Sequence, residues 1–557
     1  MILDYFDPSA PDVYQCDVCV IGAGPAGIAI ASAFAHSPFS VCVLESGGLE
    51  SERRTQALNE GESVGPVELD PAMCRLRALG GSSRLWGGGC VPLTRLDMAP
   101  RDWVPSSGWP IGFEELVTWS ERARPLFDLD NGYGIGDGGF DGTGPGPALP
   151  LCTRQAVQRI CFISPVLFQC RYRTLLEDAP NITLVLHANL MDLAASDDAG
   201  QVQAATIGNL AGRRGTVRAR HYVLAAGGIE NARLLLHSNG VRRGGLGNDN
   251  DQVGRYFMDH PRCVGGRIVD GDFDALLQPY RGQVARKGQA LYPVLALADD
   301  AQCELGVLNA RARPIPVPAT PAGLQALREL RATFRRAAPG DGEGVEQEVD
   351  RALTAGLPVT LQHAPRDNAL RARLALRVGR NAGHVAGAIA RRLRRRPVDT
   401  YRHAELMIYF EQAPNRESRI TLAESRDALN MRRARVDWRF TDLDYASYRT
   451  AATVLGHDAA RCCNGRFEAE PWVDDPALRP PLVGTAHHIG STRMAVRPED
   501  GVVDPDCRIH GMDNLHVAGS SVFPTGGWAF PTFTIVALAL RLADRLRERL
   551  QEPAGYS

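Results

Sequence analysis

Three glycines near the N-terminus have the spacing of a dinucleotide-binding turn. Residues 16–21 form a short apolar run that is typical of a buried parallel strand, and Gly22, Gly24 and Gly27 follow it at once. In such a turn the first glycine allows the chain to leave the strand, the second lets backbone approach a pyrophosphate, and the third lets helix and strand pack closely. The helix predicted over 25–35 would direct its free N–H groups at the phosphates.

A carboxylate stands at the end of the next predicted strand. Residues 41–44 are apolar, and Glu45 lies 18 residues beyond Gly27, where its oxygens can accept hydrogen bonds from ribose hydroxyls. A glycine-rich turn alone is a weak signal, but this one follows a strand, opens a helix and reaches an acid. It therefore predicts a dinucleotide site and leaves nicotinamide and flavin both open.

A second glycine-rich stretch covers residues 80–90. Five glycines and two serines among these eleven residues exclude a stable helix or an ordinary strand. Trp86 and the flanking arginines are not typical of a flexible linker. The composition favours a loop that brings bare backbone against a flat ring or a phosphate.

Two further blocks place glycines after predicted strands. Residues 182–193, 202–210 and 216–224 alternate like the strands of a β-meander, and the Gly pair after the last of them predicts a second approach of backbone to the nucleotide. Near the C-terminus, residues 515–518 predict a buried strand. The last helix begins at Pro531, and its free N–H groups can stabilise a negative flavin ring.

Length and composition restrict the class of protein. A chain of 557 residues predicts two domains or more, and a net charge of −2 gives no global field for nucleic acid. The 13 cysteines follow no framework or zinc spacing, so no metal site is expected, and free thiols favour a reducing compartment. The first 15 residues lack a basic start and an apolar stretch, and no apolar run reaches the ~18 residues of a membrane span. We expect a cytoplasmic enzyme.

Together these motifs resemble the glucose–methanol–choline (GMC) family of flavoproteins. The resemblance rests on the N-terminal fingerprint, GGSSRLWGGG, AAGGIENARLLL, HHIGSTRM and SSVFPTGGWAFPTFTIVALALRLAD, in the family's order, whereas about 265–480 matches only in place and general character. It implies an α/β fold with a Rossmann-like FAD-binding domain and a substrate domain of antiparallel sheet and helices. The implied boundaries are 1–112, 170–264 and 484–557 for the first domain, and 113–169 and 265–483 for the second.

The resemblance also implies bound FAD. Some relatives carry the flavin covalently on a histidine in the glycine-rich loop; Leu85 stands at that place here and cannot form the bond, so we expect FAD without a covalent link. The residues expected to hold the cofactor are Gly22, Gly24, Pro25, Ala26, Gly27, Glu45, Ser46, Gly80, Gly81, Ser82, Ser83, Trp86, Gly88, Gly89, Cys90, Leu190, Ala225, Ala226, Gly227, Gly519, Ser520, Ala529, Phe530 and Thr532.

In that family a histidine three residues before the glycine of an H-x-x-G motif acts as the base, which here is His487. A group whose pKa lies near neutrality suits removal of a hydroxyl proton as hydride leaves. The adjacent His488 is the second catalytic candidate, with a core role as its alternative reading. The family usually places a second His or Asn before the proline of the last helix, but Phe530 stands there, 43 residues after His487. His260, Trp528 and Thr525 are candidate substitutes, and His260, Trp528 and Phe530 are expected to line the substrate pocket.

The leading hypothesis is oxidation of a hydroxyl group on a polyol, sugar or specialised metabolite, with hydride passing to flavin. A first alternative keeps the flavin for desaturation, C–H oxidation or rearrangement, because Phe530 removes the second polar group. A second alternative is a flavoprotein subunit that docks on an electron-acceptor partner or membrane surface. Its candidate contact is 371–396, with nine arginines and no acid, which we predict to be one amphipathic helix. The alternative reading of this segment is a solvated helix packed on the substrate domain.

Overall fold

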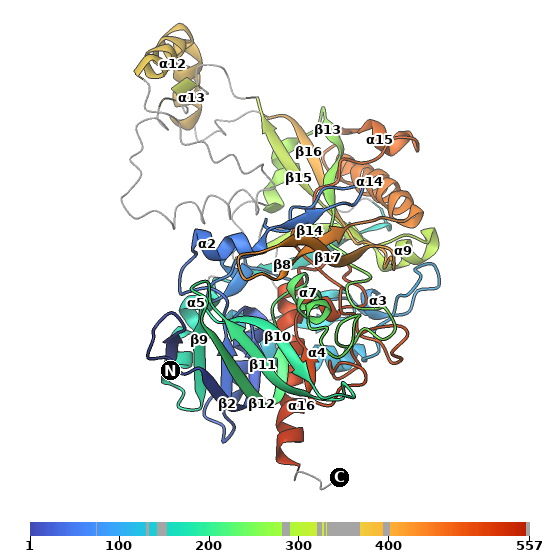
Figure 1. The fold of residues 1–557 in the computed structure, drawn as a ribbon. Coiled ribbons are helices and arrows are strands. Elements are labelled where there is room, and N and C mark those ends of the chain that lie inside the picture. Colours follow the sequence, from blue (N-terminus) through green and yellow to red (C-terminus); the bar gives the residue numbers. More distant parts are fainter. Residues whose placement is uncertain are drawn as a thin grey trace.

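The protein is organised around two large β-sheets. The computed structural model describes residues 1–73, 75–129, 133–141, 153–280, 290–319, 326–327, 330, 368–393 and 401–552. In Figure 1 strands β2, β9, β10, β11 and β12 lie near the N-terminus, and β13, β15 and β16 lie at the opposite end of the molecule.

The first sheet holds the dinucleotide motif. The short strand β3 is buried at every position, as expected of a strand covered on both faces, and β2, β3, β9 and β12 pair in parallel. In spatial order the strands are β1 (Ile2–Asp4), β9 (Ile182–Leu186), β3 (Val41–Leu44), β2 (Val13–Ile21), β12 (Arg214–Leu224), β11 (Val202–Gly208) and β10 (Asn189–Ala195), with β20 (Leu515–Val517) also paired to β12.

The single strand predicted over 182–193 is wrong. His187, with φ of 56°, separates two strands, of which β9 pairs in parallel with β3 and β10 pairs antiparallel with β11. Only β10, β11 and β12 therefore form the meander. An alternating pattern does not reveal such a break, because one residue in the left-handed region changes the chain direction without changing the hydrophobicity on either side.

Helices pack on this sheet and on one another. The small-residue helix α1 (Pro25–Phe34) packs on α16 (Pro531–Gln551), which in turn packs on α4 (Phe113–Ala123). Pro531 occupies the first turn of α16, where a missing N–H costs nothing. The shorter helices are α2 (Arg53–Gln56), α3 (Arg95–Met98), α5 (Phe168–Arg171), α6 (Arg173–Asp178), α7 (Glu230–His237), α8 (Phe273–Leu277), α9 (Asp299–Leu305) and α15 (Pro471–Asp474).

The second sheet is antiparallel throughout and packs on the long helix α14 (Asp442–Cys462). In spatial order its strands are β19 (Arg466–Ala469), β13 (Arg262–Val269), β16 (Tyr401–Phe410), β15 (Ala310–Pro318), β14 (Leu291–Leu297), β8 (Ala156–Ile163) and β5 (Gly89–Cys90). A small sheet of β17 (Arg419–Arg426), β18 (Arg432–Asp437) and β4 (Gly61–Ser63) and the hairpin β6 (Gly134–Gly136)–β7 (Gly139–Asp141) complete the described strands. The proposed domain boundaries stay a prediction.

The strand β15 has no clear signature in the sequence. It contains Pro314, Pro316 and Pro318, and proline is normally a sign against a strand because it lacks a backbone donor. Beyond Ala312 the strand pairs with β16 alone, so these prolines lie where β15 needs hydrogen bonds on one side only. Tertiary pairing thus places a proline-rich stretch, and the residues before it, in the second sheet.

The arginine-rich segment is two helices, so the prediction of one continuous helix over 371–396 is wrong. A turn at Asn381 separates α12 (Asn368–Arg380) from α13 (Ala382–Leu393), and residues 394–396 lie outside the described part of the chain. Figure 1 shows both helices set apart from the two sheets. Docking of this segment on a partner or surface stays a prediction. Within the described residues no helix combines the length and apolar character needed to cross a bilayer.

Candidate functional site

Three glycines with open space around them follow three adjacent parallel strands. Gly24 comes after β2, Gly227 after β12 and Gly519 after β20, and these strands pair in the order β2–β12–β20. A Cβ added at Gly24 or Gly227 would meet no atom within 4 Å, and one added at Gly519 would meet only the Asn231 amide at 3.9 Å. Bare backbone at the carboxyl edge of a parallel sheet is where open α/β folds bind nucleotides.

Two other glycines in the first motif are required by packing. Gly22 has φ of 109°, and a Cβ there would lie 2.6 Å from the carbonyl oxygen of Ala225. A Cβ on Gly27 would lie 1.9 Å from the carbonyl oxygen of Gly22. Because these contacts are with backbone, no side-chain rotation relieves them. Both positions hold the turn and α1 against β2, so that Gly24 is left facing open space.

Glu45 lies directly beside the glycine turn. Its two carboxylate oxygens accept backbone hydrogen bonds from Ala23, at 3.0 Å, and from Gly47, at 2.9 Å. Burial raises its pKa to about 7, an effect that these two bonds and Arg77 oppose. The carboxylate therefore positions the turn itself, and each oxygen keeps lone-pair capacity for a hydroxyl of a ligand.

The glycine-rich loop closes over the same turn. A 3₁₀ segment, Gly81–Leu85, brings Gly81 so near that its added Cβ would lie 3.0 Å from Cα of Gly24. Trp86 packs against Phe127 and Phe168, with ring centroids 5.9 and 6.1 Å away, so it anchors the middle of the loop in an aromatic cluster.

At its end the loop joins the second sheet through β5. Cys90 is buried there, and burial raises its pKa well above the usual range. A Cβ on Gly89 would lie 2.9 Å from the ring of Phe530, so this glycine admits the aromatic residue that precedes α16.

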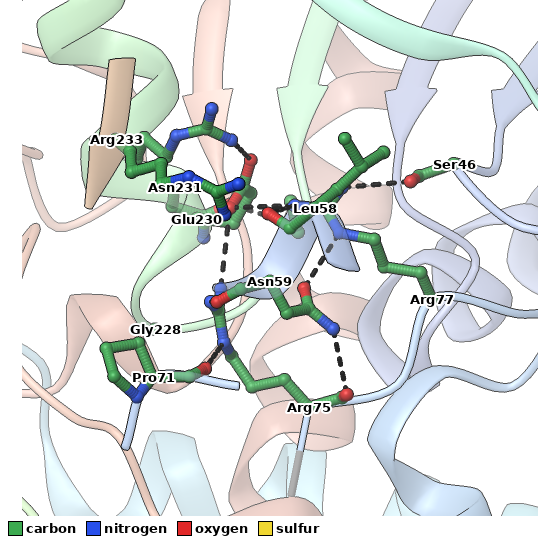
Figure 2. A network of polar contacts seen from close by, with 12 residues as sticks. Ser46, Leu58, Asn59, Pro71, Arg75, Arg77, Gly228, Glu230, Asn231 and Arg233 are labelled. Atoms are coloured by element: carbon green, nitrogen blue, oxygen red, sulfur yellow. Dashed lines mark hydrogen bonds and ion pairs between the residues drawn. The ribbon is translucent and has the colours of Figure 1, made fainter. Parts of the chain in front are cut away.

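A buried ionic network anchors the chain just before this loop (Figure 2). Glu230 on α7 accepts contacts from Arg75, Arg77 and Arg233 at 3.4, 3.1 and 2.7 Å. These arginines hold the pKa of the Glu230 carboxyl far below its usual range, against the opposing effect of burial. Arg77 also donates to the hydroxyl of Ser46 at 2.9 Å. The network thus ties the loop, the end of β3 and α7 into one unit.

Asn231 connects two of the nucleotide-facing turns and has no exposed surface. Its Oδ1 accepts from the amide of Ala226 at 2.8 Å, and its Nδ2 donates to the carbonyl of Ala518 at 3.1 Å and to the hydroxyl of Ser521 at 3.0 Å. One buried amide side chain therefore fixes the segments that follow β12 and β20 relative to each other.

His487 is held by a network that centres on Asp259. The Asp259 carboxylate accepts the backbone N–H groups of His260, Ala486 and His487 at 2.6, 3.0 and 2.9 Å. The Nδ1 atoms of His260 and His487 lie 2.9 Å apart, and the hydroxyl of Thr485 lies 3.1 Å from the same His487 nitrogen. Ala486 has φ of 61°, a conformation that non-glycine residues adopt mainly when their surroundings impose it.

Burial and positive charge keep this histidine pair neutral. Burial, followed by His260 and Arg311, lowers the pKa of His487 well below its usual range. Burial and then Arg311 lower the pKa of His260 to about 4. Burial raises the pKa of Asp259 in spite of its hydrogen bonds. Neutral imidazoles at neutral pH have a lone pair with which to accept a proton.

His488 contacts a different part of the molecule from His487. Its ring lies 5.8 Å from that of Phe257, and its main chain abuts Gly228, where a Cβ would lie 2.3 Å from the His488 carbonyl oxygen. Burial lowers its pKa to about 3. His488 thus packs with the segment after β12, and its catalytic role stays a prediction.

The candidates around position 530 differ in what they contact. Phe530 lies edge-on to His487, with ring centroids 5.5 Å apart. Trp528 is buried, and the hydroxyl of Thr525 accepts from Nε1 of Trp109 and donates to the carbonyl of Asp97. The other predicted residues lie as follows: Pro25 and Ala26 begin α1, Gly80, Ser82, Ser83 and Gly88 lie in or beside the 3₁₀ loop, Leu190 is buried on β10, Ala225 follows β12, Ser520 donates to the His488 carbonyl, and Ala529 and Thr532 flank the start of α16.

Several residues at this site were missed by sequence reasoning. Asp259 stands beside His260, and Thr485 stands in the histidine motif, so both were within reach of the motif itself. Asn231 lies in the AAGGIENARLLL block, but nothing in the sequence distinguishes its role from that of the other residues of the helix. Arg311 and Tyr409 belong to the region without motifs, and only the pairing of their strands brings them to the site.

Comparison with known proteins shows what the chain is similar to. Residues 414–539 match the family model described as GMC oxidoreductase. A C-glycoside 3-oxidase from Arthrobacter globiformis is 33% identical over 24% of this chain and 25% of its own. A 2-methyl-1,2-propanediol dehydrogenase from Mycolicibacterium austroafricanum is 26% identical over 63% of this chain and 52% of its own. The chain thus matches a quarter of the first relative's length and about half of the second's.

The fold is shared over almost the whole chain. The crystal structure of a pyridoxine 4-oxidase from Mesorbium loti superposes with a TM-score of 0.54 at 16% identity, covering 96% of this chain and 99% of that one. The predicted α/β fold class is confirmed by this match. Residues 414–539 are thus similar to the GMC oxidoreductase family, and the rest of the chain shares the fold of the pyridoxine 4-oxidase.

Proposed function

We propose that this protein is a FAD-dependent oxidoreductase that removes hydride from the carbon of a CH–OH group, with His487 as the base and a polyol, sugar or specialised metabolite as substrate. The observation that carries the proposal is the position of His487, which contacts Phe530 edge-on and is followed by His488, whose carbonyl abuts Gly228 after β12. The relatives named as C-glycoside 3-oxidase and 2-methyl-1,2-propanediol dehydrogenase support an alcohol or sugar-like substrate.

The residues present fit a bound FAD. Gly24 and Gly81 would admit its pyrophosphate and Glu45 its ribose, while the backbone at Gly227 and Gly519 would line the cofactor along the sheet edge. Leu85 supports a cofactor held without a covalent link. When bound, FAD supplies the hydride acceptor, and this chain's own residues supply binding, orientation and proton transfer.

The hydrogen bonds around His487 favour one tautomer. The hydroxyl of Thr485 has two acceptors for its proton, Asp259 Oδ1 at 3.1 Å and the carbonyl of His260 at 2.9 Å. Its oxygen is then free to accept from Nδ1–H of His487, which also points at Nδ1 of His260. With Nδ1 protonated, His487 keeps its Nε2 lone pair for the hydroxyl proton of a substrate.

His260 then supplies the polar nitrogen that Phe530 lacks. If its Nδ1 accepts from His487, its Nε2 carries the proton, and this enclosed atom lies against the backbone of Gly526. The contact between the two Nδ1 atoms makes His260 a polar group in direct contact with the candidate base. We assign the second polar role to His260 rather than to Trp528 or Thr525.

A second candidate function follows from the apolar ring at position 530. Phe530 lies edge-on to His487, which favours chemistry that needs one base, such as desaturation, C–H oxidation or rearrangement. In that case His260 would act only to hold the His487 tautomer.

An anaerobic visible titration tests the proposal. The flavin-loaded protein is titrated with alcohols, polyols and sugars beside His487→Ala and the control His457→Ala, whose exposed side chain lies on α14. We expect the oxidised flavin band to bleach in the wild type and in the control, and to persist in His487→Ala. If no alcohol bleaches the wild type while dithionite does, hydroxyl oxidation is excluded and the second candidate takes its place.

A further inference from the structure

A buried arginine faces the same site from the second sheet. Arg311 is the second residue of β15 and is only 3% exposed. It pairs across the sheet with Tyr409 on β16, and Tyr409 pairs on its other side with Arg262 on β13. Directly paired residues project from the same face of a sheet, so the three side chains form one row, Arg262–Tyr409–Arg311.

Aromatic rings surround the Arg311 guanidinium. Its central carbon lies 3.8 Å from the ring centroid of Tyr409, 4.8 Å from that of Phe530 and 5.6 Å from that of Trp528. Phe530 in turn contacts His487 edge-on. Arg311 and the candidate base His487 therefore contact the same ring, that of Phe530. Arg311 lies on the side of the site that β15 and β16 form.

No acid of the described chain neutralises this charge. The side chain of Arg311 makes no hydrogen bond or ion pair with any described residue, and its Nε is fully enclosed without a partner. Glu411, two residues beyond Tyr409, is taken up by Arg101, whose two terminal nitrogens lie 2.8 and 2.5 Å from its oxygens. Arg262 adds a second positive charge, and its Nη1 lies 3.5 Å from the hydroxyl of Tyr409.

The Arg311 guanidinium is thus a buried positive charge that contacts aromatic rings and no acid. Burial of a charge is unfavourable unless it is paired and hydrogen-bonded, and ring faces offset only a part of that loss. The planar fork of arginine donates two parallel hydrogen bonds to a carboxylate or a phosphate. The row of two arginines about Tyr409 has the charge and the donors to hold such a group.

We propose that Arg311 binds the carboxylate or phosphate of an acidic hydroxylated substrate, so that the oxidised CH–OH group lies between this anionic group and His487. The inference rests on the proposed function and names the substrate class for that site. Phe530 would separate the two polar ends, keeping the anion away from the base. Binding of the anionic group is not a redox step, and the oxidation itself uses only FAD as hydride acceptor.

Binding and flavin reduction are measured separately with matched pairs of probes. The pairs are glycolate with ethylene glycol, gluconate with sorbitol, and glycerol 3-phosphate with glycerol, so the arms distinguish carboxylate from phosphate. Calorimetry on the flavin-loaded protein measures affinity, and anaerobic bleaching measures oxidation. Arg311→Met removes the charge at similar length, Arg311→Lys keeps the charge without the fork, and Arg377→Met on the exposed face of α12 is the control.

We expect the wild type and Arg377→Met to prefer the anionic member of at least one pair by about ten- to a hundredfold, the range for hydrogen bonds to a charged group. Arg311→Met should lose this preference and Arg311→Lys should retain part of it. Equal affinity for both members of every pair in the wild type overturns the proposal, as does an unchanged preference in Arg311→Met. Acids that bind without bleaching the flavin support the anion site and contradict hydroxyl oxidation. Neutral polyols that bleach it, with no binding of acids, support the oxidation and contradict the anion site.

Discussion

Gly24 and Gly27 stand three residues apart in one motif, but the structure predicts opposite consequences for their replacement by alanine. Gly27→Ala places a Cβ 1.9 Å from the carbonyl oxygen of Gly22, a contact that only movement of α1 away from β2 can relieve. Gly24→Ala places a Cβ in open space, and the Gly24 backbone, with φ of −80° and ψ of −173°, is a conformation that alanine adopts readily.

The expected magnitudes differ in sign for the protein without cofactor. Overpacking costs about 1–3 kcal/mol, and because backbone opposes backbone we expect Gly27→Ala to lower the free energy of unfolding by about 3 kcal/mol. Gly24→Ala should raise it by about 0.4–1 kcal/mol, since alanine restricts the unfolded chain. If a pyrophosphate approaches Gly24, the same methyl group should weaken FAD binding by about ten- to a hundredfold.

Two measurements check this pair of variants. Thermal or urea unfolding of the apoproteins gives the stabilities, and titration of each apoprotein with FAD, followed by flavin fluorescence, gives the affinities. Gly212→Ala serves as a control, because its Cβ also meets no atom within 4 Å. Gly212 lies in the turn between β11 and β12, at the end of the sheet away from the site. Its φ of 87° should make alanine mildly unfavourable for stability there. If Gly24→Ala binds FAD as tightly as the wild type, the phosphates do not approach this turn and the assignment of the sheet edge fails.

Two further predictions concern buried carboxyl groups. Glu230→Gln leaves the surrounding arginines without their charge partner and should lower the free energy of unfolding at pH 7 by about 3–5 kcal/mol. The control Glu424→Gln, at an exposed ion pair with Arg432, should leave the free energy of unfolding unchanged. Equal effects of the two variants in urea unfolding would contradict a structural role for the network. Glu45 has its pKa raised by burial from 4.5 to about 7, so the folded apoprotein retains a proton that the unfolded chain has lost, and stability should fall by about 3 kcal/mol as pH rises through this window. Glu45→Gln should remove that part of the pH dependence, and an unchanged slope would show that Glu45 is already ionised in the fold.

Local sequence patterns were sufficient to predict the features that depend on neighbouring residues in the chain. The turn from Gly22 to Gly27, the helix after it, the acid at Glu45 and the start of α16 at Pro531 are all properties of contiguous residues. The strand β3 has the predicted bounds because a short, wholly apolar run between turns has few alternatives. The family resemblance added His487 on the same basis, through a motif of adjacent residues.

The tertiary structure decided what depends on distant pairing. The break at His187, the strand β15 with its prolines, and the turn at Asn381 that divides α12 from α13 follow from backbone geometry and pairing that hydrophobic periodicity does not encode.

The candidate site shows the same division. The sequence by itself determined that a dinucleotide turn and a histidine motif are present. Only folding brings His260 within 2.9 Å of His487 and places Arg311 over Phe530, because those contacts join segments about 200 residues apart. Burial then gives these residues their chemistry, since it keeps the histidines neutral and leaves the arginine charge without an acid to pair with.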